Sequence, residues 1–316
     1  SKECIILNHK SLLWLFFVII CLVNGTTWGA QRIGLENSLP FWSSSMRFII
    51  SGSLICIILL IFKKWKLPPK GYMLALFYGI FYFSVPFGTV YWGTQYVSSG
   101  LVSVLMSMLA VMLLIFNKIF GGIPATKMQI SGVLFSLIGI IIIFWQTFQI
   151  DYSLLSIVSM LLILTSGLGS ALVTIKVRDH LSYMPIFNFN AVAMIIGGIG
   201  LGFASLLLEN GNRTFHGPSL YALLYLSTVG SVIGLALYMT LLKHWHVSRA
   251  SAHLFISPAI ALYLGSFFLG ETLNIYTYVG TALILCGVML INISPKVITT
   301  IFQYFSTNIH KNRSNT

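Results

Sequence analysis

The sequence predicts an all-α, polytopic membrane protein, and three observations support this prediction. The 316 residues are 57% hydrophobic and only 8% charged, whereas soluble domains carry about 25% charged residues. The apolar residues form runs of the ~20 residues that a bilayer-spanning helix needs. The stretch 257–292 has a weaker copy 148 positions upstream. A chain of this length and composition has room for about ten spans and for no separate soluble domain.

We expect ten transmembrane helices connected by short polar segments. Their approximate ranges are 12–31, 41–62, 72–91, 99–120, 128–146, 153–175, 185–208, 219–242, 250–269 and 275–293. The first run is too long for the core of a signal peptide and lacks a convincing cleavage pattern, so we expect it to remain in the protein as a span. A polar, basic tail follows Pro295.

The distribution of lysine and arginine predicts the orientation. With the N-terminus in the cytoplasm, fifteen of the eighteen basic residues fall on the cytoplasmic side, and only Arg32, Arg47 and Arg213 fall elsewhere. Cytoplasmic loops of membrane proteins are enriched in these residues, and an error of one span would destroy the alternation. We therefore expect a plasma (bacterial inner) membrane protein with both termini cytoplasmic. The net charge of +12 has the same explanation, so no nucleic-acid partner is expected.

The internal copy predicts two halves, 12–146 and 153–294. Three glycines of the first half align with three of the second: Gly122, Gly132 and Gly139 with Gly270, Gly280 and Gly287. Because each half holds five expected spans, an odd number, the second half enters the membrane from the opposite side. Inverted repeats of this kind are typical of transporters that work by alternating access. We therefore expect two inverted five-helix repeats and a transport function rather than an enzymatic one.

Several short motifs in a fixed order resemble one known family. The last spans carry Gly270-Glu271, Leu273, Gly280 and Gly287 behind Pro258; the early spans carry Gly25-Thr26-Thr27-Trp28, Pro40, Arg47-Phe48, and Tyr91-Trp92 to Gln95-Tyr96. Over about residues 12–294 the chain resembles the EamA-type family of the drug/metabolite transporter superfamily. The resemblance implies a ten-helix exporter or importer of small metabolites. Ile123 and Ala110 depart from the family pattern, which has an acid and a proline there.

The candidate substrate-binding residues are aromatic and polar side chains, most of them at helical spacing. They are Trp28, Gln31, Arg32, Tyr78, Tyr82, Tyr91, Gln95, Asn188, Tyr225 and Tyr238. An aromatic cavity with a few amides and hydroxyls suits amphipathic, neutral or zwitterionic solutes. We therefore predict a central cavity for amino-acid-like, amphipathic or drug-like substrates. Helix packing explains each of these residues at least as well.

Four residues are assigned structural roles: Arg47, Pro258, Gly270 and Glu271. The expected span cores contain no Asp or Glu, and proton relays in membranes usually use such acids, so carboxylate-driven antiport is disfavoured. Glu271 is interpreted as a helix-end residue. Arg47 has two interpretations, a counter-ion for a substrate carboxylate or a structural anchor, and its position in the family pattern favours the anchor.

The alternative function is an intramembrane enzyme or sensor that uses His244, His246 and His253. A metal site needs fixed geometry and usually an acid or thiol partner, and the sequence places none nearby, so interfacial histidines are the favoured interpretation. We expect no cofactor and no metal. The expected partners are the small-molecule substrate and the lipid bilayer. A homodimer through the Gly198–Gly202 GxxxG motif is kept as a hypothesis.

Overall fold

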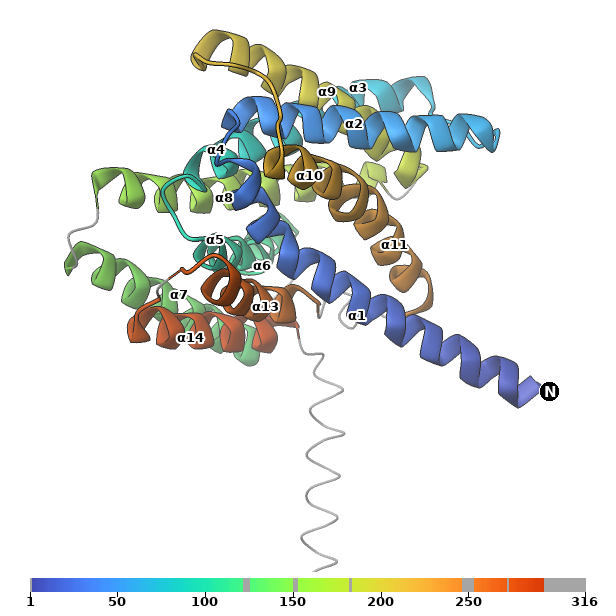
Figure 1. Ribbon diagram of the computed structural model, residues 1–316. Helices are drawn as coiled ribbons and strands as arrows, with labels where there is room; N and C mark the ends of the chain where they lie inside the picture. The colour runs from blue at the N-terminus through green and yellow to red at the C-terminus, as the bar shows by residue number, and fades with distance from the viewer. Residues whose placement is uncertain are drawn as a thin grey trace, which may run out of the picture.

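The computed structural model describes residues 2–121, 126–149, 153–181, 184–245, 253–271 and 273–292. Within these ranges every regular element is a helix (Figure 1). The elements are α1 (Lys2–Gly34), α2 (Pro40–Ile61), α3 (Pro69–Tyr78), η1 (Gly79–Ser84), α4 (Val85–Gly93), α5 (Ser99–Ser107), α6 (Leu109–Gly121), α7 (Lys127–Gln149), α8 (Leu154–Leu181), α9 (Ile186–Leu208), α10 (Pro218–Tyr225), η2 (Leu226–Ile233), α11 (Gly234–His244), α13 (His253–Phe268) and α14 (Ile275–Asn292).

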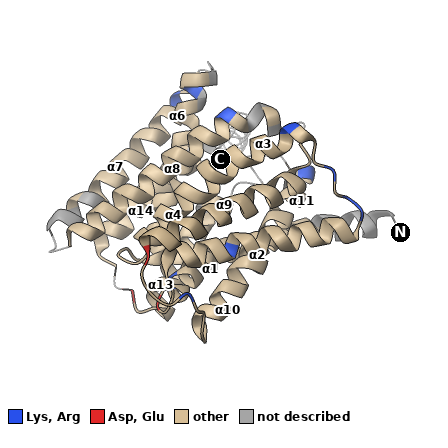
Figure 2. Ribbon diagram, turned by 90° about the horizontal axis from the view of Figure 1, so that it is seen from above, with Lys and Arg blue, Asp and Glu red and all other residues tan. Residues whose placement is uncertain are grey.

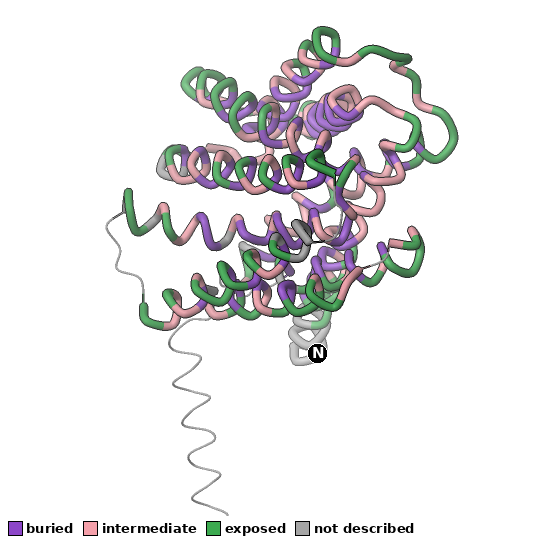
Figure 3. Tube along the Cα trace, turned by 90° about the vertical axis from the view of Figure 1, so that its left-hand side faces the viewer, coloured by how far each residue is buried: buried purple, intermediate pink, exposed green. Residues whose placement is uncertain are grey.

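Seven helical segments are long and apolar enough to cross a membrane. They are Ser11–Gly34, Pro40–Ile61, Pro69–Gly93, Ser99–Phe120, Leu154–Val177, Ile186–Leu208 and Pro218–Leu241. Three shorter apolar helices cover Lys127–Ile143, Ile256–Phe268 and Ile275–Leu290. Large apolar side chains face outward, with Leu207 83% and Ile61 70% exposed, and Figure 3 shows exposed residues along the outer faces of the helices. Such a surface requires lipid, so the chain is a multi-pass membrane protein; ten spans stay a prediction.

Local signals in the sequence explain where several helices begin. Pro40, Pro69 and Pro218 occupy the first turns of α2, α3 and α10. Proline suits this position because the first helical N–H groups have no intrahelical partner and its fixed φ is already helical. Ser98 precedes α5, and its hydroxyl accepts from the backbone N–H of Leu101 at 3.4 Å. These signals fix the ends of the spans that surround the candidate site.

Glycines bring α7 and α14 into backbone contact at the lower edge of Figure 1. An ideal Cβ on Gly139 would lie 2.5 Å from the carbonyl oxygen of Gly280, and one on Gly280 would lie 2.7 Å from that of Gly139. Gly287 similarly approaches the carbonyl oxygen of Gly132. These four glycines belong to the repeat seen in the sequence, so the repeated positions of the two halves meet each other.

The helices α2 and α9 form an equally close pair at the upper edge of Figure 1. A Cβ on Gly52 would lie 2.6 Å from the carbonyl oxygen of Ala191, and one on Gly198 would lie 2.9 Å from that of Ser45. Ser45 also donates its hydroxyl to the Gly198 carbonyl at 2.7 Å, and Gly202 faces the same serine. The GxxxG glycines of α9 therefore serve a contact within the chain.

One end of the helical bundle, which we call the acidic end, carries Glu36, Glu209 and Glu271 in the loops after α1, α9 and α13. Hydrogen bonds join these loops to neighbouring helices: Glu209 accepts from the N–H of Phe41 at 2.7 Å, and Glu271 accepts from that of Ser99 at 2.7 Å. The red ribbon segments of Figure 2, which mark Asp and Glu, lie together on this side of the molecule.

The opposite end, which we call the basic end, carries Lys63 and Lys64 after α2 and Lys176 near the end of α8. The Asn188 amide donates to the Lys64 carbonyl at 3.2 Å and so holds the start of α9 against the loop after α2. Most blue ribbon segments in Figure 2, which mark Lys and Arg, lie away from the red ones. The charge separation predicted from the sequence is thus a property of the two ends of the bundle.

Two helices contain π-helical segments. Gly79–Ser84 (η1) lies between α3 and α4, and Leu226–Ile233 (η2) lies between α10 and α11. In η2 the Ser231 hydroxyl donates to the carbonyl of Leu226, five residues earlier, at 3.0 Å. π-Helical turns are rare and are found frequently at functional sites. The α3–η1–α4 and α10–η2–α11 helices are therefore candidates for functional elements.

Candidate functional site

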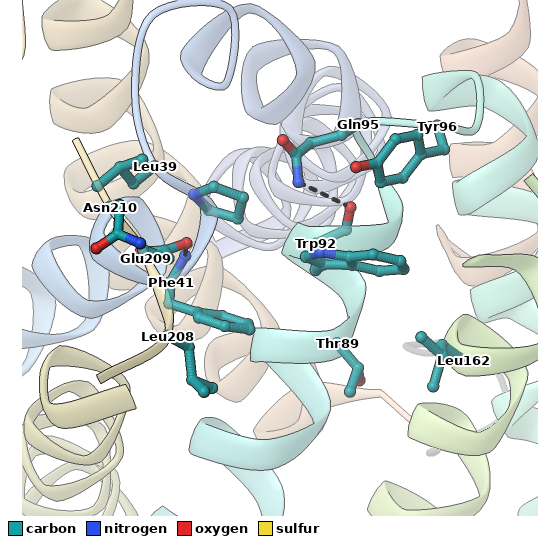
Figure 4. Close-up of a pocket in the computed structure, with 11 residues that line it drawn as sticks. Leu39, Phe41, Thr89, Trp92, Gln95, Tyr96, Leu162, Leu208, Glu209 and Asn210 are labelled. Atoms are coloured by element: carbon teal, nitrogen blue, oxygen red, sulfur yellow. Dashed lines mark hydrogen bonds between the residues drawn. The ribbon is translucent and has the colours of Figure 1, made fainter. Parts of the chain in front are cut away.

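A cavity of about 500 Å³ opens at the acidic end between the start of α2, the ends of α4 and α9, and Leu162 of α8. It is lined by Leu39, Pro40, Phe41, Thr89, Trp92, Gln95, Tyr96, Leu162, Leu208, Glu209 and Asn210. In Figure 4, Trp92, Gln95 and Tyr96 face Phe41 and Glu209 across it. We call this cavity the acidic-end pocket. Its volume is in the range of small-molecule sites, and its mixture of rings and amides suits an amphipathic ligand.

Hydrogen bonds hold the Glu209 side of the acidic-end pocket in place. The Glu209 carboxylate accepts from the backbone N–H groups of Phe41 at 2.7 Å and Trp42 at 3.2 Å, so it caps the N-terminus of α2, where a negative charge is stabilised. Arg213 donates to the carbonyls of Ser205 at 2.7 Å and Glu209 at 2.8 Å. The carboxylate is therefore engaged by the protein, and the Gln95 amide and Tyr96 hydroxyl offer polar atoms to a ligand.

A second cavity of about 630 Å³ adjoins the first, since Thr89 lines both. Its lining residues are Phe77, Phe81, Val85, Pro86, Thr89, Phe120, Thr165, Ser166, Gly169, Leu172, Val173 and Lys176. Among these, Lys176 is the one charged residue, and it lies toward the basic end. The two cavities lie along α4 and α8, and together their walls form a long, mostly apolar surface. Such a surface suits the hydrocarbon part of an amphipathic solute.

A buried polar cluster surrounds Arg47 on α2. The Arg47 side chain is only 6% exposed. Its Nε donates to the Ser231 hydroxyl of η2 at 3.1 Å, and its Nη1 donates to the Tyr91 hydroxyl of α4 at 3.2 Å. The ring of Phe48 lies 5.5 Å from the guanidinium carbon. Among the described residues no carboxylate pairs with this cation, although a buried charge without a counter-ion is costly.

Gln31 of α1 lies beside this cluster and is 1% exposed. Its Nε2 donates to the Thr94 hydroxyl at 2.8 Å, and that hydroxyl donates to the Val90 carbonyl at 2.7 Å. Because the Thr94 hydrogen is used, Thr94 accepts from Gln31, which fixes the orientation of the amide. The Gln31 Oε1 has no partner in the part of the chain that the structure describes. Gln31 therefore presents an unused acceptor inside the bundle.

A small cavity of about 10 Å³ separates Gln31 from its neighbours. It is lined by Gln31, Gly34, Ser43, Tyr91, Phe215, Ser219, Leu223 and Leu226. This volume holds about one water molecule. Gln31 and Tyr91, which is a partner of Arg47, therefore both line a gap of about one water volume.

The structure divides the ten sequence-predicted binding residues among several environments. Gln95 lines the acidic-end pocket, and Gln31 and Tyr91 line the small cavity beside Arg47. Trp28 packs against an apolar core cluster. Arg32 donates to the Thr94 carbonyl. Gln95 thus lines one cavity, and Gln31 and Tyr91 line another; a substrate-binding role for these residues stays a prediction.

The remaining predicted residues make packing contacts or bonds to other helices. The Tyr78 and Tyr82 rings stack with centroids 4.4 Å apart, in a cluster with Phe189 and Phe83. Asn188 bonds to the Lys64 carbonyl, as described above. The hydroxyl of Tyr225 lies 2.5 Å from that of Thr26, and the Tyr238 ring lies 5.3 Å from the ring of His253.

Gly270 and Glu271, two of the predicted structural residues, lie at the junction of α13, α14 and α5. Gly270 has a φ of +62°, which favours glycine. This turn carries the Glu271 carboxylate back to the N-terminus of α5, where it accepts from the Ser99 N–H at 2.7 Å and the Ser99 hydroxyl at 3.0 Å. Pro258 lies inside α13. The Glu271 carboxylate therefore caps the N-terminus of α5.

The histidines proposed for the alternative function have separate surroundings. The His244 Nδ1 lies 2.9 Å from the Thr240 carbonyl oxygen. His253 is buried beside Tyr238, and His246 lies outside the described residues. In the described ranges, no group of three or more His, Cys, Asp or Glu side chains could hold a metal ion. Nothing in this arrangement supports an enzyme or sensor.

Sequence reasoning missed most of the residues that line the acidic-end pocket, including Phe41, Thr89 and Asn210. It also missed Ser231 and Thr94 as partners of Arg47 and Gln31. The need of a buried arginine for polar partners was a usable signal. It could not select Ser231, because serine and threonine occur throughout the apolar runs.

The apolar outer surface and the helices of membrane-spanning length define the class, a multi-pass helical membrane protein. The model of the EamA-like transporter family matches residues 11–145 and 157–293, and the chain belongs to this family.

Similar proteins in other organisms are named as transporters. An uncharacterized transporter of Buchnera aphidicola subsp. Schizaphis graminum is 28% identical over 272 residues, covering 85% of this chain and 90% of that protein. The uncharacterized inner membrane transporter YedA of Escherichia coli K12 is 27% identical over 295 residues, covering 91% and 93%. A solved crystal structure matches with a TM-score of 0.63 and 13% identity, covering 89% of this chain and 96% of that one, which shows the fold alone. The chain is therefore a membrane transporter.

Proposed function

We propose that this protein moves small amphipathic metabolites, including amino-acid-like and drug-like solutes, by alternating access between two inverted five-helix halves, residues 12–146 and 153–294. The observation that carries the proposal is a reciprocal pattern of contacts between corresponding positions of the two halves. Such reciprocity is what a two-fold relation between the halves requires, because residue i then meets j of the partner and j meets i.

The α7–α14 pair follows this pattern with an offset of 148 residues. Gly132 and Gly139 correspond to Gly280 and Gly287, and the contacts are crossed: Gly139 meets Gly280, and Gly132 meets Gly287. At the centre, the Ser136 hydroxyl donates at 3.4 Å to the carbonyl of Ile284, its own counterpart. The crossing means that the helices run antiparallel, which supports opposite directions of entry for the two halves.

The α2–α9 pair follows the same pattern with an offset of 146 residues. The corresponding positions are Ser45 and Ala191, Ile49 and Ile195, and Gly52 and Gly198. Gly52 contacts Ala191 and Ile195, whereas Gly198 contacts Ser45 and Ile49. Two independent helix pairs therefore support one two-fold relation. In the same relation, η1 and η2 occupy corresponding third helices, which are candidates for the elements that bend during rocking.

The acidic-end pocket and the adjoining apolar cavity favour amphipathic solutes over small inorganic ions, because their walls are aromatic and aliphatic with few polar groups. Ten spans with the basic end and both termini in the cytoplasm follow from the charge distribution. The relatives' names describe transporters, and we assign no catalytic role to His244 or His253.

The proposal is tested by transport into proteoliposomes that contain the purified protein. We expect saturable counterflow of at least one solute from a panel of labelled amino acids, nucleosides and amphipathic cations. Empty liposomes report passive leak. A matched variant, Gln95→Ala in the acidic-end pocket, should change the apparent affinity for the solute, whereas Gln129→Ala outside the pocket should not. Failure of every solute in the panel to move would contradict a transport function.

A further inference from the structure

We propose that Arg47 is the binding site for the carboxylate of the transported solute, and that the solute carries a hydrogen-bond donor beside that carboxylate. This inference rests on the transport function proposed above and names the class of solute: small organic acids with an adjacent amino or hydroxyl group. It assigns binding to the enclosed cluster of Arg47, Tyr91 and Gln31 rather than to the acidic-end pocket alone.

Arg47 has hydrogen-bond donors that the protein does not use. A guanidinium has five N–H donors, and in the described part of the chain Arg47 uses one on Ser231 and one on Tyr91. Both partners are neutral hydroxyls, so the positive charge is not balanced. The loop carboxylates of Glu209 and Glu271 are engaged at the N-termini of α2 and α5. A carboxylate that binds the planar guanidinium by two parallel hydrogen bonds would supply the missing charge.

One side of the Arg47 guanidinium is not covered by a side chain of η2. The Arg47 Nη2 donates to no protein atom among the described residues. It lies next to Gly230, where an ideal Cβ would be 3.6 Å from Nη2 and 3.4 Å from the Thr27 hydroxyl. Because glycine occupies this position, η2 leaves this side of the guanidinium without a covering side chain. The Tyr91 hydroxyl accepts from Arg47, so its own hydrogen can be donated to the same carboxylate.

Gln31 offers a hydrogen-bond acceptor to the same solute. Its Oε1 is buried, has no partner in the described ranges and lies at the small cavity that Tyr91 also lines. A buried acceptor without a partner costs free energy unless a donor fills the site. An ammonium or hydroxyl group next to the bound carboxylate would provide that donor. Arg47 and Gln31 would then bind the two adjacent polar groups of one solute.

Access requires η2 to move. The cavity holds about one water molecule, and Leu226 of η2 forms part of its wall. Ser231 of the same segment bonds to Arg47. A solute carboxylate would replace Ser231 on the guanidinium when the α10–η2–α11 helix moves away. The enclosed cluster is then the closed form of the site, and the π-helical turn is the segment that opens it.

The test is a binding measurement on the full chain in lipid nanodiscs with matched probes. The probes are leucine, its hydroxy-acid analogue 2-hydroxy-4-methylpentanoate, plain 4-methylpentanoate, leucinamide, and the same four compounds with a benzyl side chain. We expect wild-type protein to bind the two donor-bearing acids in at least one series about tenfold or more tightly than the amide. Arg47→Gln should remove that preference, and Arg47→Lys should retain part of it.

Two further variants keep the test decisive. Gln31→Leu should remove the preference for the amino and hydroxy acids over 4-methylpentanoate while it leaves the preference for acid over amide. Tyr91→Phe keeps the ring and should weaken acid binding several-fold, which covers the case in which Arg47→Gln does not fold. The control is Lys127→Gln, which removes an exposed cation at the start of α7 and should leave the ligand preferences unchanged.

Equal binding of acids and amides by wild-type protein, or acid binding unaltered in both Arg47→Gln and Tyr91→Phe, would overturn the assignment. Counterflow of the same probes in proteoliposomes distinguishes a failure of the binding-site assignment from a failure of the proposed transport function. Probes that bind in an Arg47-dependent manner but do not cross the membrane would contradict transport and support the site. Probes that cross at equal rates in wild-type and Arg47→Gln protein would support transport and contradict the site.

Discussion

At the scale of single residues, the clearest finding is that carboxylates at the acidic end stabilise helix N-termini. Glu209 and Glu271 each accept hydrogen bonds from the first backbone N–H groups of a helix that is distant in sequence, α2 and α5 respectively. These N–H groups have no partner within their own helix, and the helix dipole favours an anion there. The two acids therefore hold loops and spans together.

Replacement of Glu271 by alanine should lower stability, because it leaves the Ser99 N–H and the N-terminus of α5 without their acceptor. The expected loss is about 0.5–2 kcal/mol. Thermal unfolding in nanodiscs measures it, with Glu36→Ala in the loop after α1 as the control. A variant as stable as wild type would contradict the capping role.

Gly270 has a left-handed backbone conformation, with a φ of +62°. Gly270→Ala should therefore destabilise the protein by about 1 kcal/mol, although no neighbouring atom lies within 4 Å of an added Cβ. Gly169→Ala is a matched control, because its Cβ also meets nothing within 4 Å and its helical backbone accepts alanine. Equal melting temperatures for the two variants would show that backbone strain is absent at Gly270.

At the scale of elements, the close helix pairs α7–α14 and α2–α9 depend on small residues at crossed positions. Leucine and isoleucine side chains find an equally apolar environment in lipid and between helices. Apolar surface alone therefore does not hold such helices together. Close backbone approach at Gly139, Gly280, Gly52 and Gly198 permits the packing instead. The same kind of small-residue surface occurs on both pairs, which is why the pairs look alike.

Alanine at these glycines should separate the pairs. Gly139→Ala would place a Cβ 2.5 Å from the Gly280 carbonyl oxygen, and Gly52→Ala would place one 2.6 Å from that of Ala191. We expect a loss of about 1–3 kcal/mol for each, as for other overpacked sites. Gly29→Ala is the control, since its nearest neighbour would be 3.9 Å away. Unfolding temperatures equal to that of Gly29→Ala would refute tight packing.

At the scale of the whole molecule, the acidic-end pocket forms where segments remote in sequence meet. The start of α2, the end of α4, the α8 residue Leu162 and the end of α9 each supply part of its wall. Its adjoining cavity extends toward Lys176 at the basic end. The rocking motion that we propose would alter this surface, since α2 and α4 lie within residues 12–146 and α8 and α9 within residues 153–294.

Trp92→Ala should weaken transport of amphipathic solutes, because Trp92 is the largest ring in the acidic-end pocket. Loss of its apolar and stacking contacts should raise the KM several-fold. Proteoliposome uptake measures the effect. Trp145→Ala is the control, because that side chain is 66% exposed on the outer surface. A KM change of the same size in both variants would argue against a role for the pocket.

The sequence predicted spans better than contacts. Apolar runs located the seven spans of membrane length to within a few residues, as the range 41–62 and the helix Pro40–Ile61 show. The candidate site was only partly predictable. Gln31, Tyr91 and Gln95 line cavities, but Tyr78, Tyr82 and Asn188 are used in packing or in holding a loop. Both faces of such helices are apolar, so periodicity does not reveal which face is buried.

The sequence by itself determined the class of protein, its membrane setting and its family, because hydrophobic length, charge placement and motif order are properties of short segments. Only the tertiary structure decided which polar groups meet. Arg47, Tyr91 and Ser231 come from three different helices, and the rotation of each helix decides whether its polar side chains face one another or lipid. That rotation is set by packing between helices, to which remote parts of the chain contribute together.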